Sequence, residues 1–461
     1  MPMFELRSSL AALASAAALA GCATTGQEPP PRPAAEIATP AEWQVDAPAG
    51  RFDADVLGFR PDPQLQALIA EALENNADLQ IAGARLEQAH AALKAAGAPL
   101  LPSVGVVGQA GAATLPGSSL STTGLAAVAS WEVDLWGRLR AERDAGRARS
   151  QAAELDARYA REALAGAVVR AWLGVVEASQ QVALAHDMLA LSEQQLQLMR
   201  TGRAVGRNSD QEVALSEAGV QAYRQQVQVD EQMLGHTQRA LAILLGRYPS
   251  ADPAPMGRLP DLAALPAAGI PEELLTRRPD VLAAEQRFHA ALHDVEAAKR
   301  ARLPSLQLVG GVAYVADSVV TLESAISNPV SALSGKLLAP IFTGGRIEAQ
   351  IEAKTAAQQE AMAEFAKVSL RALAEVEEAL ASERALTRRE EIVARQVALL
   401  GQAVDYAEVE RTVGKGDLRQ VLAKKLNLAA AQADLLHLRS ERLTNRVALH
   451  QALGGRFSPA R

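Results

Sequence analysis

Large aromatic side chains and cysteine are both scarce in this 461-residue chain. Phe, Trp and Tyr together make up 3% of the residues, and the single cysteine is Cys22. Because aromatic rings contribute much of the buried area of an ordinary core, this chain cannot easily build a bulky globular one. Its abundant alanine instead favours helices that pack closely through small side chains. A single cysteine excludes a disulfide within the chain.

The sequence also lacks a long hydrophobic run near its start. The apolar segment Leu10–Ala20 is too short to span a bilayer but suits a signal peptide. The quartet Leu19-Ala20-Gly21-Cys22 is similar to a bacterial lipobox, so we expect residues 1–21 to be removed as a lipoprotein signal peptide. Cys22 would then carry a covalent lipid, and the proline-rich residues 22–61 would form a lipid-anchored tether. The alternative is a plain signal peptide with an incidental cysteine.

Neither a basic patch nor a catalytic motif is present. The formal net charge is −7, and Lys and Arg alternate with Asp and Glu, so nucleic-acid binding is not expected. His289 and His293 lack the Glu of a zinc protease, and we interpret them as ordinary helix-surface histidines. Glu377 and Glu378 lie in a charged helical run and most simply form a solvated face. We therefore expect no enzyme, no metal and no cofactor beyond the lipid on Cys22.

Proline is absent from two long stretches, between Pro116 and Pro249 and between Pro340 and Pro459. Within them Ala, Leu, Gln, Glu and Arg predominate, which favours helices. A helix from Leu139 to about Arg200 would be roughly 90 Å long, far longer than a globular domain needs. The other predicted helices of these stretches are Ile347–Glu410, Asp210–Leu245 and Leu418–Leu453. The pattern predicts two helical hairpins of unusual length.

The chain contains an internal repeat. The segment from Asp78 to Ser103 aligns without a gap with the segment from Asp280 to Ser305, and further matches continue through both hairpins. One supersecondary unit used twice predicts a pseudo-symmetric architecture. The expected parts of the mature chain are a first repeat at 62–248, a linker at 249–270, a second repeat at 271–455 and a tail at 456–461. Each repeat begins with a third helix, at Gln64–Ala96 and Pro271–Ala301, with breaks at Asn76 and Arg278–Pro279.

Alternating apolar and polar residues predict two β-strands in each repeat. The expected strands are Ser103–Ala113, Leu125–Leu135, Ser305–Val315 and Leu333–Ile341. In the second of these, Leu125, Trp131 and Leu135 share a face opposite Ser130 and Glu132. Alternation over about ten residues is typical of membrane β-strands, although strands of a soluble sandwich look similar.

Four strands cannot close into a membrane barrel, because the smallest barrels need about eight and lipid tolerates no open sheet edge. If these strands span a membrane, several chains must share one barrel. Two copies would supply about eight strands and three about twelve. The arithmetic requires an oligomer and leaves the number of copies open.

Several motifs together point to one family. They are Arg277–Glu285, Leu303–Ser305, Ser130–Arg138, Ala339–Arg346 and Ala452–Gly455. These motifs resemble the outer-membrane factors of tripartite efflux systems, the TolC-like family, especially its NodT-type lipoprotein branch. The resemblance covers about Asp62 to Gly455. It implies an α+β membrane protein in which a homotrimer forms a 12-stranded β-barrel on an α-helical periplasmic tunnel. It also implies a periplasmic membrane-fusion adaptor and an inner-membrane pump of the RND type as partners.

By the same resemblance, the two hairpin turns are periplasmic tips that contact the adaptor. Val205-Gly206-Arg207-Asn208-Ser209 matches the family's Val-Gly-x-x-Ser pattern, and Val413-Gly414-Lys415-Gly416-Asp417 carries Asp in place of Ser. The resemblance thus assigns adaptor docking to Val205, Gly206, Ser209, Val413, Gly414 and Asp417. A plainer interpretation is that the glycine permits a tight turn and that Ser or Asp caps the following helix.

The second hairpin departs from the family at its gate. The family commonly reads Val-Leu-Asp-Ala-Gln-Arg there, whereas this chain has Val421-Leu422-Ala423-Lys424-Lys425-Leu426. A carboxylate ring at Ala423 is therefore absent, and any ionic lock must use other groups. We expect Lys424 and Lys425 to face solvent rather than to form a cationic constriction.

These observations predict a passive exit duct in the outer membrane of a Gram-negative bacterium, in contact with outer-membrane lipid and extending into the periplasm. No Asp follows Cys22 to signal retention in the inner membrane. The alternative is a lipid-anchored periplasmic coiled-coil scaffold or adaptor without a barrel.

Overall fold

The computed structural model describes residues 40–45, 47–48, 50, 52–54, 57–59, 63–115, 118–250, 257–316 and 330–457. Cys22, the expected signal peptide and most of the expected tether lie outside the described residues, as do residues 458–461. Contacts divide the chain into two compact units. Unit 1 includes residues 85–154 and 283–368, and unit 2 includes residues 38–84, 155–282 and 369–461.

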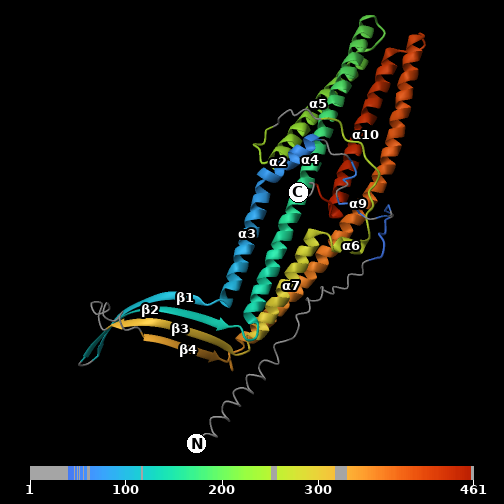
Figure 1. Ribbon diagram of the computed structural model, residues 1–461. Helices are drawn as coiled ribbons and strands as arrows, with labels where there is room; N and C mark the ends of the chain where they lie inside the picture. The colour runs from blue at the N-terminus through green and yellow to red at the C-terminus, as the bar shows by residue number, and fades with distance from the viewer. Residues whose placement is uncertain are drawn as a thin grey trace. The chain divides into compact units, whose positions relative to one another are not determined.

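Two helical hairpins contain the longest helices of the described chain (Figure 1). Helices α4 (Arg138–Ala204) and α9 (Arg346–Thr412) each contain 67 residues. Helices α5 (Asp210–Leu244) and α10 (Leu418–Ala452) return from them and each contain 35 residues. At 1.5 Å per residue, α4 is roughly 100 Å long. The predicted pair of long hairpins is confirmed, and corresponding helices of the two hairpins are equal in length.

The helix that begins each repeat is broken where the sequence predicts. In the first repeat, Asn76 separates α2 (Pro63–Asn75) from α3 (Ala77–Gly97), which a short 3-10 turn, η1 (Ala98–Leu100), extends. The buried Asn76 side chain accepts from the backbone N–H of Asp78 and Leu79 and donates to the Leu244 carbonyl at the end of α5. It therefore caps two helix ends at once. In the second repeat, the corresponding helices are α6 (Pro271–Leu275) and α7 (Pro279–Arg300).

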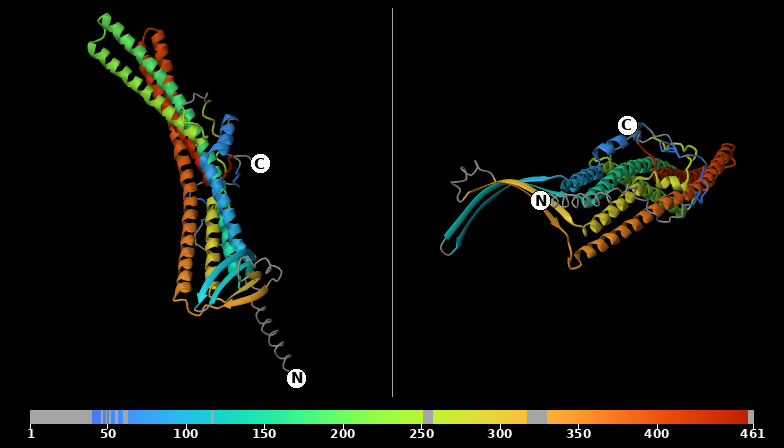
Figure 2. Two further views of the ribbon diagram at one scale, coloured as in Figure 1. Left: turned by 90° about the vertical axis from the view of Figure 1, so that its left-hand side faces the viewer. Right: turned by 60° about the horizontal axis from the view of Figure 1, so that its bottom comes forward.

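The four strands form one antiparallel sheet in the order β1-β2-β3-β4, which Figure 2 shows as strands running side by side. They are β1 (Ser103–Leu115), β2 (Ser118–Val133), β3 (Ser305–Ala316) and β4 (Val330–Leu338). The central pairing, between β2 and β3, joins the first repeat to the second. The described residues thus contain the four predicted strands.

Two predicted strand ends are wrong. Leu135 lies beyond the end of β2, because the Asp134 carboxylate turns to accept from the backbone N–H of Leu139 and Arg140 at the start of α4. Ile341 lies beyond the end of β4 and is exposed. Pro340 precedes it, and a proline has no N–H to donate to the sheet.

The core of unit 2 is built around the middle of α4. Trp172, Leu173 and Val176 are buried there against α2, the end of α5 and the end of α10. Small side chains such as Ala72 and Ala165 are fully buried among them, which confirms the expected close packing through alanine. Among the described residues, no helix combines the length and apolar character that crossing a membrane requires.

Candidate functional site

The register of the sheet gathers apolar side chains from all four strands on one face. Trp131 of β2 lies opposite Leu308 of β3, and Leu306 lies opposite Leu337 of β4. The same face carries Val104, Val106, Leu125, Val133, Val312, Tyr314 and Leu333. Ser130, Glu132, Gln307, Lys336 and Ser334 point to the other face. The predicted alternation is confirmed.

This apolar face is uncovered in the single chain. Val104 is 76% exposed and Leu333 is 84% exposed. Strands β1 and β4 are the sheet's edges and pair with no further strand among the described residues. A large uncovered apolar face with two open edges indicates a surface that another chain or a membrane covers.

The first hairpin tip is a tight turn closed by a capping box. Gly206 has a φ of +71°, a left-handed conformation that side chains other than glycine rarely adopt. The Ser209 hydroxyl accepts from the Glu212 backbone N–H at 3.2 Å, and the Glu212 carboxylate accepts from the Ser209 backbone N–H at 2.7 Å. The hydrogen bond from that backbone N–H and the one from the Ser209 hydroxyl lower the pKa of Glu212. Val205 beside the glycine is exposed.

The second tip has the same turn and a different cap. Gly414 has a φ of +73°, and Val413 beside it is exposed. Asp417 accepts from the backbone N–H of Arg419 at 3.1 Å and from its guanidinium at 2.6 Å, and these contacts lower the pKa of Asp417. The expected capping by Ser and Asp is confirmed. The two tips differ chemically, because one presents a neutral hydroxyl and the other a carboxylate paired with Arg419.

Matched variants can test the two helix caps against each other. Replacing Ser209 by Ala removes the acceptor for the Glu212 N–H, and we expect the start of α5 to lose about 1 kcal/mol of local stability. Amide hydrogen exchange at residues 210–213 should therefore be faster. The matched change Asp417→Ala should accelerate exchange at the start of α10 and leave α5 unchanged. Equal exchange at both tips in both variants would contradict the assigned caps.

The gate region contains one internal ion pair. The Lys425 ammonium lies 2.6 Å from the Glu408 carboxylate of α9, and the Lys425 side chain is 38% exposed. The hydrogen bond from Lys425, aided by its charge, lowers the pKa of Glu408. Ala423 is exposed, and Lys424 and Leu426 are half-buried. The pair joins the two helices of one hairpin.

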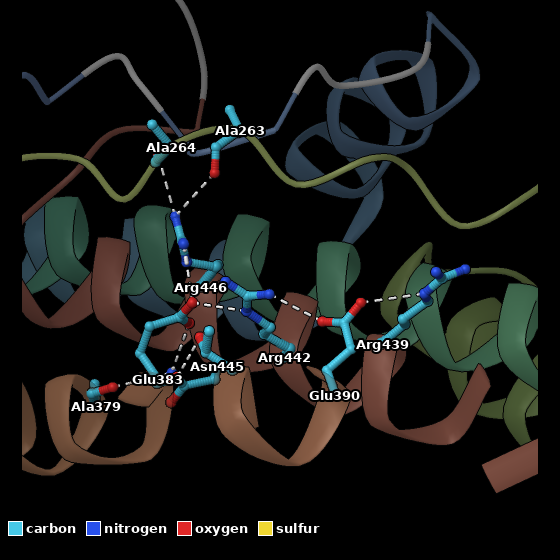
Figure 3. Close-up of polar contacts among 10 residues, drawn as sticks. Ala263, Ala264, Ala379, Glu383, Glu390, Arg439, Arg442, Asn445 and Arg446 are labelled. Atoms are coloured by element: carbon cyan, nitrogen blue, oxygen red, sulfur yellow. Dashed lines mark hydrogen bonds and ion pairs between the residues drawn. The ribbon is translucent and has the colours of Figure 1, made fainter. Parts of the chain in front are cut away.

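A buried ionic cluster holds α9 against α10 (Figure 3). The Glu383 carboxylate accepts from the Arg442 Nε at 2.8 Å and from the Arg446 Nη2 at 2.9 Å. The Glu383 cluster is completed by Glu390, Arg439 and Asn445. Arg446 also donates to the Ala264 carbonyl of the linker at 3.2 Å. Burial alone would raise the pKa of Glu383, but the hydrogen bonds from Arg446 and Arg442 lower it below its ordinary value.

The sequence carries a signal for this cluster that composition alone does not reveal. Glu383 and Glu390 are seven residues apart on α9, and Arg439, Arg442 and Arg446 follow one another at helical spacing on α10. Opposite charges repeated at such spacing on two helices of a hairpin indicate facing stripes.

The Arg277–Glu285 motif closes the end of α10. The Arg278 guanidinium is almost fully buried and lies 2.8 Å from the Asp280 carboxylate and 2.7 Å from the Glu375 carboxylate. It also donates to the Ala452 carbonyl at 3.0 Å, and Arg277 donates to the Leu453 carbonyl at 2.9 Å. The motif therefore supplies the donors that the last carbonyls of a helix require.

Two further interpretations of the sequence are wrong. Glu377 is not simply solvated, because its carboxylate accepts from the backbone N–H of Gln44 at 2.7 Å and of Val45 at 3.1 Å and so holds the N-terminal segment. His289 and His293 are not on the open surface, because their side chains are only 13% and 16% exposed. No group of three or more candidate ligands that could hold a metal occurs in the described part of the chain.

Comparison with known proteins shows which family this chain is similar to. The model of the outer membrane efflux protein family matches residues 68–247 and 270–455. The pyoverdine export outer membrane protein OpmQ of Pseudomonas putida is 32% identical over 444 residues, which cover 92% of this chain and 94% of OpmQ. The probable outer membrane lipoprotein SilC of Salmonella typhimurium is 26% identical over 462 residues, which cover 98% of this chain and 99% of SilC.

A solved structure agrees with these relatives. The outer membrane protein VceC of Vibrio cholerae superposes with a TM-score of 0.77 at 26% identity, over 86% of this chain and 97% of VceC. The chain therefore belongs to the outer membrane efflux protein family.

Proposed function

We propose that this protein is the outer-membrane exit duct of a tripartite efflux pump and that three copies build it. The observation that carries the proposal is the four-stranded sheet with one continuous apolar face and two unpaired edges. In lipid such edges must be paired. Three copies joined edge to edge, β4 of one to β1 of the next, would form a barrel of about twelve strands with its apolar face outward.

Exposed seams on the helices support assembly of several copies. On α5, Leu215, Val229 and Ile243 are exposed at multiples of seven residues. On α9, Ile392, Leu399 and Tyr406 are exposed at intervals of seven. A seven-residue repeat of apolar side chains is the seam along which helices pair in a coiled coil. In the proposed trimer, α5 of one copy packs against α9 of the next and closes the tunnel.

The family relationship and the geometry of the two hairpin tips support the proposed partners of the duct. The two turns at Gly206 and Gly414 form the docking surface for a periplasmic adaptor, with Val205 and Val413 as exposed apolar contacts. An inner-membrane pump of the RND type supplies the energy, and substrates diffuse passively through the duct. A lipid on Cys22 anchors the chain, a proposal that the lipoprotein SilC supports. The family relationship favours this duct over a periplasmic scaffold or adaptor without a barrel.

A variant without the lipid tests the duct. Purified Cys22→Ala protein should still need detergent, because the apolar sheet face alone holds it in the membrane, and it should give discrete conductance steps in a planar bilayer. Leu399→Glu places a charge in the α9 seam and should abolish both the trimer and the conductance, whereas Leu399→Ile should preserve both. Cys22→Ala protein that is freely soluble and never conducts would favour the scaffold.

A further inference from the structure

A groove lies where α4, α5 and α10 meet in unit 2. Its volume is about 890 Å³, within the range of sites that hold drug-sized molecules. Small residues on α4 and α10, including Gly174, Ala178 and Ala433, leave the hollow open. Larger side chains from α4 and α5, Met188, Tyr223 and Met233, line it as well.

The groove lies on the side of α10 that faces away from the linker. Leu443 packs against the linker residues Leu259 and Leu262, and Arg446 binds the linker carbonyl of Ala264. Asp434 and His437, which line the groove, project from the other side of α10, since a helix turns once every 3.6 residues. The linker covers the first side, and Phe52 of the N-terminal segment lies against His450 there, with 6.0 Å between the ring centroids. The opposite side of α10, which carries the groove, therefore faces the lumen of the duct. This inference rests on the duct proposed above.

The charges that line the groove are of one sign. Glu177, Asp230 and Asp434 contribute carboxylates, and no lysine or arginine of the described chain lines it. His437 lies 2.7 Å from Glu177, and Gln226 donates to Asp230 at 3.0 Å, so two of the carboxylates already have partners. Asp434 makes no hydrogen bond or ion pair with any other described residue. One free carboxylate thus stands beside a largely apolar hollow.

We infer that the groove is a transit site for amphipathic organic cations inside the duct. The hollow suits an apolar body, since methionine side chains adapt their shape to what they contact. A cationic centre is attracted by the Asp434 carboxylate and by the ring face of Tyr223. Three copies of the groove would line the lumen and raise the local concentration of such cations against anions of equal size.

Tetraphenylphosphonium and tetraphenylborate test this inference, because they have nearly the same shape and opposite charge. Each is titrated calorimetrically into full-length trimer in detergent, with protein-free micelles as the blank. Tetraphenylphosphonium should bind saturably and tetraphenylborate at least about fivefold more weakly. Asp434→Asn should weaken tetraphenylphosphonium binding about fivefold, and Tyr223→Leu about threefold, whereas Tyr223→Phe keeps the ring and the affinity.

The matched control is Asp187→Asn, which removes a carboxylate from α4 next to Met188 but outside the groove. It should bind tetraphenylphosphonium as the unmodified protein does. Equal binding of the two ions, equal losses in Asp434→Asn and Asp187→Asn, or no saturable binding at all would overturn the inference. Conductance of each variant in planar bilayers separates these outcomes, since a channel that conducts and binds neither ion retains the duct function without the site.

Discussion

Replacing Glu383 by Gln should be among the most destabilising single changes in this chain, with an expected loss of about 3–5 kcal/mol. The side chain is 4% exposed and faces Arg446, which is 3% exposed, and Arg442, which is 19% exposed. Removing the negative charge leaves two guanidinium groups in or near the interior without their shared counter-ion. The penalty for an unpaired buried charge is the reason for the large effect.

Glu391→Gln is the matched control. Glu391 lies on the same helix eight residues further along and is exposed, so its loss should change stability by less than about 0.5 kcal/mol. Thermal unfolding of the full-length protein, followed through its tryptophan fluorescence, to which the buried Trp172 contributes, reports on the core next to the cluster. If the two variants unfold at the same temperature, the Glu383 cluster does not stabilise the hairpin.

The pH dependence of the Glu383 effect has a definite sign. Because the folded protein holds the pKa of Glu383 below its ordinary value, the unfolded chain binds a proton more readily than the folded one. The stabilisation is thus fully present above the unfolded pKa of about 4.3 and is lost as the pH falls through the lower folded value. The difference in unfolding temperature between Glu383→Gln and the unmodified protein should be constant at neutral pH and shrink below about pH 4.

The sequence predicts those parts of this fold that depend on residues close together in the chain. Between Pro116 and Pro249 no proline interrupts the chain, so α4 and α5 and the turn between them follow from propensity and from Gly206 alone. The faces of the strands follow from alternation, and the register of β2 and β3 brings Leu125 and Tyr314 together as that alternation requires. The caps at Ser209 and Asp417 also follow, because capping involves residues only two or three positions apart.

Contacts between distant segments could not be predicted in this way. Glu377 holds the backbone of Gln44 and Val45, more than 300 positions away, and nothing in a pair of helical glutamates specifies such a partner. The end of β2 was predicted wrongly for a different and local reason, because Asp134 belongs by alternation to β2 but caps the start of α4. The sequence also could not predict that Asp434 lies beside a groove, because the groove forms only where three helices meet.

Replacing Arg278 by Gln should lower the free energy of unfolding by roughly 3–5 kcal/mol, about as much as Glu383→Gln. Here the group that is lost is the buried cation, and the two carboxylates lose their buried partner. The Arg278 side chain is 3% exposed and binds Asp280, Glu375 and the Ala452 carbonyl together. Burial by itself would lower the pKa of the guanidinium, but its bonds to the two carboxylates raise it, so the group stays charged. Its removal leaves Asp280, 11% exposed, without that cation and leaves the Ala452 carbonyl at the end of α10 without its Arg278 donor.

Arg371→Gln separates this effect from a general loss of positive charge. Arg371 lies 3.8 Å from both Asp280 and Glu375 but is 56% exposed, so its removal should cost less than about 1 kcal/mol. Arg278→Lys keeps the charge and loses the planar guanidinium that reaches three acceptors. Its loss of stability should therefore lie between those of Arg371→Gln and Arg278→Gln. Hydrogen exchange at Leu453–Gly455 should accelerate in Arg278→Gln and not in Arg371→Gln, because Arg278 alone of the two holds the Ala452 carbonyl. Should both variants exchange alike, Arg278 would not hold the end of α10 in place.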